Sequence, residues 1–281
     1  MRAIIIILSA MLLACSEETE VLKNPNMAAT TYPNEQWNFF PCAMGDDQAY
    51  IYLNTGISES IHTQPSMLAR LRLSYKAPRE DGLPTNEEFE PVSAIEDQIE
   101  AFAKEAHDCY VGRGTVGGHR IFYVYTNRDE ESWLQFIRML KSESGYQIQL
   151  AYERDPAHKG YHEELYPTED DWQVIRDLRV LENLASHGDD GSVPRQVDHW
   201  IYFENQSASL DFLSWAKNAQ YTEEPGNSHQ AEDGRYCVRV SHHGSLMIGD
   251  ISSHSISLSH KSKEYGGEYD GWETQVITPN E

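Results

Sequence analysis

Both halves of the chain show the same succession of strand-forming and helix-forming segments, and this leaves few folds open. In each half, short runs that alternate apolar and polar side chains are separated by stretches with apolar residues three to four positions apart. Strands and helices with one apolar side must bury that side against each other in layers. The succession predicts an α+β protein that contains two ferredoxin-like (split β-α-β) domains in tandem.

The first half is expected to form a ferredoxin-like unit with one additional strand. Its expected strands are residues 49–54, 67–75, 109–115, 120–126 and 147–152. The apolar stripes of its two helices are Val92, Ile95, Ile99, Phe102 and Ala106, and then Trp133, Phe136, Ile137 and Leu140. The order of these segments is β-β-α-β-β-α-β, which contains the split β-α-β unit.

Two starts compete for the first of these helices. Thr85 and Glu88 match a capping box, in which each side chain bonds to a free amide of the first turn. Pro91 suits the first position of a helix better than an interior one. We favour a short first turn, followed by a main helix from about Pro91.

The second half begins with a long helix that Thr168 caps. Residues 188–194, Gly-Asp-Asp-Gly-Ser-Val-Pro, follow this helix and are interpreted as an exposed linker. Strand patterns then cover residues 197–203, 236–240 and 268–277, with helix patterns between them. A further short strand near Tyr221 completes β-α-β-β-α-β, again the ferredoxin-like order.

The N-terminus indicates export. After Met1-Arg2 comes an apolar stretch that ends in Leu12-Leu13-Ala14-Cys15, too short to span a membrane and typical of a signal peptide. The last four residues resemble the lipobox of bacterial lipoproteins, which implies cleavage before Cys15 and a diacylglycerol on its sulfur. Ser16 in place of Asp resembles signals for the outer membrane if the host is Gram-negative.

We therefore expect four parts in the chain. Residues 1–14 are the signal peptide, and residues 15–34, which are polar and lack an apolar period, form a flexible tether. The first domain covers residues 35–167 and the second covers residues 168–281. The expected location is the cell envelope, with Cys15 holding the protein to the membrane.

Three cysteines remain after Cys15, and they allow at most one disulfide within the chain. Cys42–Cys109 is the pair that we would test, because both residues lie in the first domain. Three buried free thiols, with Cys237 as the third, are the alternative. No pair has the Cys-x-x-Cys spacing of a zinc or redox motif.

The charge of the chain limits its partners. Its formal net charge is -23 at pH 7, so its surface repels nucleic acids and anionic lipid headgroups. Direct nucleic-acid binding is therefore not expected, whereas a basic protein partner fits this charge. The acidity also keeps a protein soluble, and this alternative needs no partner.

Residues that could carry catalysis do not form a recognisable site in the sequence. His158 and His162 lack the His-Glu-x-x-His spacing of a zinc protease. His242 and His243 are adjacent on an expected strand, so they point to opposite faces. Asp198 and His199 are adjacent in the same way, and no Gly-x-Ser-x-Gly nucleophile elbow is present. We therefore expect no catalysis, no cofactor and no metal site, and interpret His199 as a core histidine.

Two stretches of the second half resemble one known family. They are Arg-Gln-Val-Asp-His-Trp-Ile-Tyr-Phe at residues 195–203 and Gly-Gly-Glu-Tyr-Asp-Gly-Trp-Glu at residues 266–273. Both look like strands of the regulator of ribonuclease E activity B (RraB) family, and the match spans about residues 168–277. The resemblance implies a ferredoxin-like fold and a binding activity, since the family inhibits ribonuclease E and alters which transcripts are degraded.

The first half resembles the domain-of-unknown-function family 695 over about residues 32–167. The resemblance rests on Trp-Asn-Phe-Phe from Trp37, Pro-Arg-Glu-Asp-Gly-Leu-Pro from Pro78, Ile-Glu-Asp from Ile95 and Val-Gly-Arg from Val111. That family is often fused to an RraB-type domain and implies no established activity.

The RraB motif also supplies the candidate protein-binding residues, which are Arg195, Asp198, Glu268, Asp270 and Trp272. A structural role is the alternative for each of them, with Trp272 packed in the core and the charges pairing the strands. Strand alternation predicts that Tyr269, Gly271 and Glu273 share one face, with Asp270 and Trp272 on the other.

The expected function is a lipid-anchored, non-catalytic protein-binding or regulatory protein of the bacterial cell envelope. Ribonuclease E is cytoplasmic, whereas Cys15 implies export, so the binding role carries over and the ribonuclease target does not. One alternative is a cytoplasmic RraB-like inhibitor of a ribonuclease, which requires an unprocessed N-terminus. Another is an envelope enzyme with a histidine-based metal site.

Overall fold

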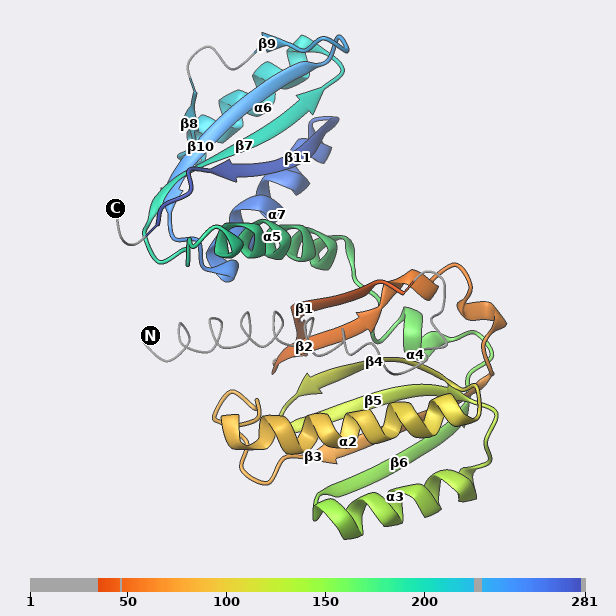
Figure 1. Ribbon diagram of the computed structural model, residues 1–281. Coiled ribbons are helices and arrows are strands. Elements are labelled where there is room, and N and C mark those ends of the chain that lie inside the picture. Colours follow the sequence, from red (N-terminus) through yellow and green to blue (C-terminus); the bar gives the residue numbers. More distant parts are fainter. Residues whose placement is uncertain (1–34, 46, 225–228, 279–281) are drawn as a thin grey trace. The chain divides into compact units, whose positions relative to one another are not determined.

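The computed structural model describes residues 35–278 except residues 46 and 225–228. The predicted signal peptide, Cys15 and the whole of the predicted tether lie outside the described residues. The chain forms two compact units that divide between Asp171 and Trp172. We call residues 35–171 the N-terminal unit and residues 172–278 the C-terminal unit, and both combine a sheet with helices (Figure 1).

The N-terminal unit contains a six-stranded antiparallel sheet in the order β1-β2-β4-β5-β3-β6. Its strands are β1 (Trp37–Met44), β2 (Asp47–Asn54), β3 (Met67–Ser74), β4 (Cys109–Val116), β5 (His119–Thr126) and β6 (Gln147–Arg154). Strands β3 to β6 have the ferredoxin-like order, and the β1-β2 hairpin extends the sheet beyond β4. The expected single additional strand is therefore wrong, because β1 is a second one. Pro41 argues against a strand in the sequence, because proline cannot donate a hydrogen bond to a neighbouring strand. β1 tolerates it because β1 lies at the edge of the sheet.

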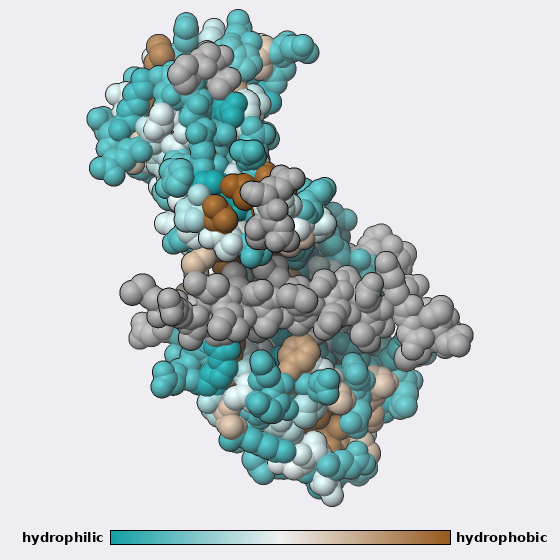
Figure 2. Space-filling view, turned by 60° about the vertical axis from the view of Figure 1, so that its left-hand side comes forward, coloured by the Kyte–Doolittle hydropathy of each residue, from teal (hydrophilic) through white to brown (hydrophobic). Residues whose placement is uncertain are grey.

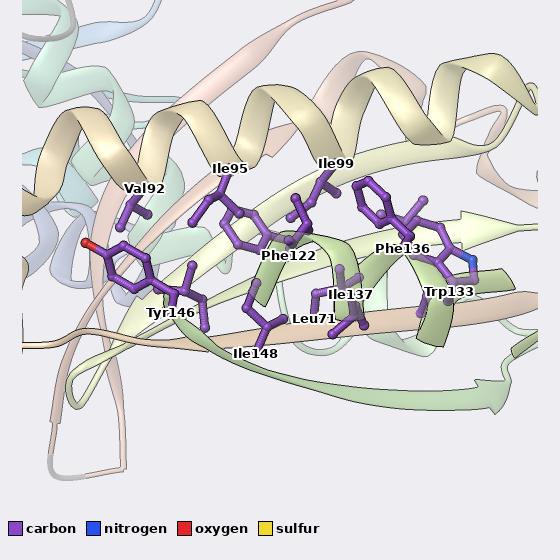
Figure 3. Packing of buried hydrophobic residues seen from close by; sticks show 14 of the residues in the cluster. Leu71, Val92, Ile95, Ile99, Phe122, Trp133, Phe136, Ile137, Tyr146 and Ile148 are labelled. Carbon is purple, nitrogen blue, oxygen red and sulfur yellow. The ribbon is translucent and has the colours of Figure 1, made fainter. Parts of the chain in front are cut away.

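The helices α2 (Asn86–Glu105) and α3 (Glu130–Ser144) lie on one face of this sheet (Figure 1). Their apolar stripes meet the sheet in a single core, as the 3–4 spacing predicts. In Figure 3, Val92, Ile95 and Ile99 of α2 point toward Leu71, Phe122 and Ile148 of the strands. Trp133, Phe136 and Ile137 of α3 close the same core. The shorter elements η1 (Thr55–Ile57), η2 (Ile61–Thr63) and α4 (Lys159–His162) complete the unit.

The helix α2 begins earlier than expected, at Asn86, and Pro91 lies inside it. Pro91 lies in the second turn, where it removes one backbone hydrogen bond, and the helix continues through it. Glu88 accepts hydrogen bonds from the backbone amides of Lys76 (2.7 Å) and Ala77 (3.2 Å), and so attaches the first turn to the preceding loop. Thr85 makes no side-chain cap bond, so the expected capping box is not formed.

All three described cysteines are free thiols, so the Cys42–Cys109 disulfide is not formed. The strand register gives the physical reason. Cys42 lies opposite Ala49, which lies opposite Val116 at the far end of β4, whereas Cys109 begins β4. Extended strand rises ~3.3 Å per residue, so about 23 Å of β4 separates Cys109 from the level of Cys42. A disulfide requires Cα atoms within about 7 Å.

The C-terminal unit also has the ferredoxin-like strand order, β11-β7-β10-β8, with all pairs antiparallel and β9 paired with β10. Its elements are α5 (Glu169–Ser186), β7 (Arg195–Phe203), α6 (Gln206–Asn218), β8 (Thr222–Glu223), β9 (His229–Gln230), β10 (Tyr236–Gly244), α7 (Ile248–Glu264) and β11 (Gly267–Thr274). The first three residues of α5 belong to the N-terminal unit, and the helix belongs to the C-terminal unit from Trp172 onward. Ile201, Phe212, Val240 and Leu258 belong to its core, which joins α6 and α7 to the sheet. Two tandem ferredoxin-like domains, the predicted fold, are confirmed.

Residues 188–194 are not a linker between the units, contrary to the sequence interpretation. They lie inside the C-terminal unit, where Asp189 is 2% exposed. Its carboxylate pairs with Arg195, and it accepts hydrogen bonds from the backbone amides of Gly191 (3.0 Å) and Ile277 (2.8 Å). A Gly- and Asp-rich composition is also that of tight turns, and the contact with residue 277 is invisible in the local sequence.

Candidate functional site

The sheet of the C-terminal unit has two faces of different chemistry. Alternation along β7 places Val197, His199 and Ile201 on the face that packs against the helices, which we call the core face. Trp200 and Tyr202 lie on the opposite face and are only half-buried. We call this second face, with the side chains of β7, β10 and β11 that share it, the open face.

The Gly-Gly-Glu-Tyr-Asp-Gly-Trp-Glu motif at residues 266–273 contains a β-bulge, which strand alternation does not predict. The register against β7 shifts between Tyr269 and Gly271, so that Tyr269 lies opposite Ile201 and Trp272 lies opposite His199. Tyr269 and Trp272 therefore both face the core, and the prediction that placed Tyr269 with Glu273 is wrong. Asp270, the additional residue of the bulge, is exposed.

Trp272 is structural. It is 7% exposed, and its indole Nε1 donates a hydrogen bond to Oδ1 of Asp177 on α5 (2.9 Å). Asp177 also accepts hydrogen bonds from Gln173 Nε2 (2.8 Å), Ser252 Oγ (2.8 Å) and Ser255 Oγ (2.6 Å). One fully buried carboxylate thus joins α5, α7 and β11. Burial raises the pKa of Asp177, and these four donors oppose that rise.

Arg195 is structural as well. Its guanidinium forms a bidentate pair with the buried carboxylate of Asp189 and donates to the backbone oxygen of Gln275 (2.8 Å). Burial raises the pKa of Asp189, but Arg195 and the backbone amides outweigh it and lower that pKa to about 2. Arg195 therefore holds the chain after α5 against the segment that follows β11, and it is not available to a partner.

The open face combines aromatic rings with arginines. The guanidinium of Arg239 on β10 lies 4.8 Å from the ring centroid of Trp200, and that of Arg235 lies 4.6 Å from the ring centroid of Tyr202. Nη2 of Arg239 also pairs with Asp198 (2.8 Å) and Glu273 (3.5 Å), so one arginine links all three strands.

Acidic groups outnumber the two arginines on and around this face. Asp198, Glu224, Asp233, Glu268, Asp270 and Glu273 are its carboxylates. Asp198 is mostly buried beneath Arg239, whereas the side chains of Glu268 and Glu273 are 77% and 58% exposed. Figure 2 shows one side of the molecule, on which hydrophilic residues cover most of the C-terminal unit.

Three histidines meet on the core face. Nε2 of His199 is 2.9 Å from Nδ1 of His242, and the rings of His242 and His254 stack with centroids 3.7 Å apart. Tyr269 Oη is 2.8 Å from Nδ1 of His199, and Tyr221 Oη is 2.9 Å from Nδ1 of His254. His199 is fully buried, as expected for a core histidine. The local sequence does not predict that His242 of β10 contacts His199, or that His254 of α7 stacks on His242.

The environment of these rings favours their neutral forms. Burial lowers the pKa of His199 well below its usual value, and the neighbouring His242 and His254 lower it further. Burial and the nearby histidines lower the pKa of His242 to about 4. Burial also lowers the pKa of His254, with Asp250 opposing the change. Within the described residues, no group of three His, Cys, Asp or Glu side chains is arranged to hold a metal ion.

The N-terminal unit uses its motif residues to bury a charge. Glu96 of the Ile-Glu-Asp motif pairs with Arg113 of the Val-Gly-Arg motif and with Arg120 (3.2 Å), and it accepts a hydrogen bond from Tyr110 Oη (2.8 Å). Burial raises the pKa of Glu96, but the two arginines and Tyr110 outweigh it, so the net shift is downward. Gly112 of the Val-Gly-Arg motif lies on β4 beside β2. A Cβ at this position would lie 2.4 Å from the backbone oxygen of Tyr52 on β2, so the close approach of the two strands requires glycine.

No helix in the part of the chain that the structure describes is long and apolar enough to cross a membrane. The predicted lipid attachment at Cys15 lies outside that part. Of the five candidate protein-binding residues, Arg195, Asp198 and Trp272 are buried, and each pairs or hydrogen-bonds within the C-terminal unit. Glu268 and Asp270 are exposed on or beside the open face, so these two remain candidates for meeting a partner.

Comparisons with known proteins agree with the motif resemblances. Residues 35–166 match the profile of the "Family of unknown function (DUF695)", and residues 175–274 match "Regulator of ribonuclease activity B" (RraB). No curated protein sequence matches the chain. Among solved structures, an unknown protein from Galdieria sulphuraria is similar over 74% of this chain and 99% of its own, with 11% identity and a TM-score of 0.19. The predicted fusion of the two families is confirmed, and the RraB match indicates a regulatory role.

Proposed function

We propose that this chain, in which a DUF695 domain precedes an RraB domain, is a non-catalytic regulator that binds a protein partner. We further propose that a lipid on Cys15 anchors it in the bacterial cell envelope, on the periplasmic face of the outer membrane if the host is Gram-negative. The RraB match supports the regulatory part. The lipobox-like Leu12-Leu13-Ala14-Cys15 supports the anchor.

The observation that carries the binding proposal is the chemistry of the open face. Trp200 and Tyr202 offer half-buried ring surface at its centre, and aromatic residues of this kind are enriched at protein interfaces. The six carboxylates around the two arginines leave this face negative. A basic protein segment that presents Arg or Lys side chains is the partner that this charge attracts.

The contacts within the open face indicate how such a segment would bind. Arg235 and Arg239 already lie over Tyr202 and Trp200, which shows that these rings accept guanidinium groups. Glu268 and Glu273 are largely exposed, so their carboxylates remain accessible to further cations. The incoming basic side chains would pair with these two glutamates at the rim, while the partner backbone crosses the aromatic centre.

The test measures binding of a fluorescent arginine–serine peptide to the full-length chain, with a glutamate–serine peptide as the probe control. The double variant Glu268→Gln/Glu273→Gln should weaken binding roughly fivefold, since each exposed ion pair contributes ~0.5 kcal/mol. The matched control Glu87→Gln/Glu90→Gln changes the net charge equally, on exposed positions of α2, and should bind as the parent does. Equal loss in both double variants would reduce the effect to net charge and contradict a specific face.

The anchor is tested by labelling cells with palmitate and separating membranes. The parent chain should take up label and sediment with the membranes, and Cys15→Ser should lose both properties. Unchanged membrane retention of the Cys15→Ser variant would contradict the lipid anchor.

The RraB match also favours a second candidate, a cytoplasmic inhibitor of a ribonuclease. An unlabelled chain in the soluble fraction, together with inhibition of purified ribonuclease E, would replace the envelope proposal with this one. The peptide experiment does not depend on this choice, because it uses the purified chain.

A further inference from the structure

The contact among His199, His242 and His254 joins three separate elements of the C-terminal unit. His199 lies on β7, His242 on the neighbouring strand β10, and His254 on α7. The rings of His242 and His254 are nearly parallel, at 20°, with centroids 3.7 Å apart. This stack is therefore a direct contact between α7 and the sheet.

The hydrogen-bond chain accommodates neutral rings. When the hydroxyl of Tyr269 donates to Nδ1 of His199, the neutral His199 ring carries its proton on Nε2. That Nε2–H group then donates to Nδ1 of His242. His242 then carries its proton on Nε2, a buried atom that has no hydrogen-bond partner among the described residues. The hydroxyl of Tyr221 can donate to Nδ1 of His254 in the same manner.

One added proton can be absorbed by reversing this chain. His242 then donates from Nδ1 to Nε2 of His199, and His199 donates from Nδ1 to the oxygen of Tyr269. A second proton places two cationic rings in contact, either in the stack or along the chain. Like charges at that distance repel, and the buried site screens them poorly.

The groups around the cluster do not compensate such charge. Within the described residues, none of the three rings forms an ion pair with a carboxylate. The titratable and charged groups that face the cluster are Tyr221 before β8, Tyr269 on β11, Asp250 on α7, Asp177 and Arg176 on α5, and His243 on β10. Asp250 is the carboxylate whose charge acts on His242 and His254, and it opposes their pKa shifts only in part. The α6 side chains Phe212, Leu213 and Ala216 in this core are apolar.

We propose that this histidine cluster is an acid-sensitive switch, in which protonation of the stacked pair separates α7 from the sheet. The trigger is the entry of charge into the cluster, and the element that responds is the packing of α7 against β10. The covalent chain stays intact, and the change reverses when the protons leave.

The sign of the effect follows from the lowered pKa values. An opened state exposes rings with pKa values near 6.5, whereas the closed state holds His242 at about 4. Between about pH 6.5 and about pH 4 the opened state therefore binds more protons, and falling pH favours opening. Above this range both states are neutral, and the closed packing is fully stable with respect to these groups.

The inference does not rest on the proposed function, and its test needs no partner. Hydrogen exchange of the full-length chain is followed by mass spectrometry at about pH 7.5 and about pH 5, with rates corrected for the intrinsic effect of pH. Peptides from α7 should lose protection roughly tenfold at the lower pH, which corresponds to ~1.4 kcal/mol. Peptides from α3 in the N-terminal unit provide the internal reference and should not change.

Two variants separate this switch from general acid sensitivity. His254→Phe keeps a ring in the stack but removes one titrating group, and it should abolish most of the acid-dependent loss of protection in α7. His243→Asn removes the adjacent histidine, which is exposed on the open face, and should behave as the parent does. Equal protection of α7 at both pH values, or equal acid-dependent loss in parent and His254→Phe, would overturn the proposal.

A measurement on the parent chain covers the case in which His254→Phe fails to fold. NMR titration of the histidine rings should show the cluster taking up protons well below pH 6.5, in the same range in which α7 amide signals shift. Rings that titrate at their ordinary pKa, with unchanged α7 signals, would likewise overturn the proposal.

Discussion

The N-terminal and C-terminal units share the ferredoxin-like strand order but differ in how Glu96, in the first, and Asp177 with the histidine cluster, in the second, are accommodated. Asp189 of the C-terminal unit, paired with Arg195, follows the pattern of Glu96. In the N-terminal unit, Glu96 is compensated by the positive charges of Arg113 and Arg120. In the C-terminal unit, Asp177 receives hydrogen bonds from uncharged donors, and no carboxylate of the described residues forms an ion pair with the histidine cluster.

This difference shows that the same fold can contain buried groups that stay in one protonation state at mildly acidic pH and buried groups that take up protons there. Opposite charges offset the cost of burying Glu96, so its pKa moves down and it remains ionised. Neutral donors only partly offset the burial of Asp177, and the buried histidines remain neutral instead. Protonation at mildly acidic pH should therefore be felt mainly in the C-terminal unit.

The largest effect is expected for Trp272→Ala. The change removes a buried aromatic side chain and deprives Asp177 of one of its four donors, so the free energy of unfolding of the C-terminal unit should fall by ~3–5 kcal/mol. Urea denaturation followed by hydrogen exchange in α7 measures this unit specifically. Trp200→Ala, on the open face, is the control and should cost less. A fully stable Trp272→Ala protein would contradict the packing described for β11.

A somewhat smaller loss is expected for Glu96→Gln in the N-terminal unit. The substitution removes the buried carboxylate with which both Arg113 and Arg120 pair, which should cost about 3 kcal/mol. Asp177→Asn keeps an acceptor and removes no countercharge, so it should cost only ~1–2 kcal/mol. Urea midpoints of the two variants, measured at neutral pH, compare them. A greater loss for Asp177→Asn would reverse the distinction between the units.

The pH dependence of stability should differ between the units. The C-terminal unit should begin to lose stability as pH falls below about 6.5, because its histidines have lowered pKa values. The raised pKa of Asp177 has the opposite effect: it stabilises the folded unit as pH falls toward the ordinary carboxyl pKa of 3.8. Glu96, with a lowered pKa, costs the N-terminal unit stability below about pH 4.5. One histidine of this unit, His119, whose pKa is lowered by burial and by Arg72, adds a loss below about pH 6.5. Urea unfolding across this pH range, resolved by hydrogen exchange, should show the C-terminal unit weakening first. Parallel loss in both units would contradict the comparison.

The smallest effect is expected on the open face. Glu268→Ala and Asp270→Ala remove exposed carboxylates and should change the free energy of unfolding by no more than about 0.5 kcal/mol. Thermal melts of the two variants beside Trp272→Ala test whether the motif divides into a structural and a surface part. A large loss in Asp270→Ala would assign the bulge a structural role for its side chain.

Much of the architecture could be predicted from local pattern. The strand and helix order of both halves, the helix cap at Thr168 and the burial of Trp272 all follow from periodicity and residue type. The errors have local causes as well. Pro41 concealed β1, Pro91 suggested a late helix start, and the composition of residues 188–194 suggested a linker.

The candidate site was less accessible to sequence reasoning. Glu268 and Asp270, which are exposed, were identified from the motif, but so were Arg195, Asp198 and Trp272, which the structure buries. A motif does not distinguish a residue that pairs strands from one that meets a partner. The exposure of the side chain distinguishes these two roles. That exposure depends on which strands and helices pack against the residue in the folded unit.

The amino-acid order alone specifies the α+β class, the two tandem units and most element boundaries, because these depend on side chains a few positions apart. Tertiary structure alone decides that Tyr269 and Trp272 share a face, since a one-residue bulge against β7 reverses the alternation. It also brings His199, His242 and His254 into contact from three elements. The contact between His199 and His242 joins residues 43 positions apart, and the energy of these contacts depends on packing and desolvation that no local pattern records.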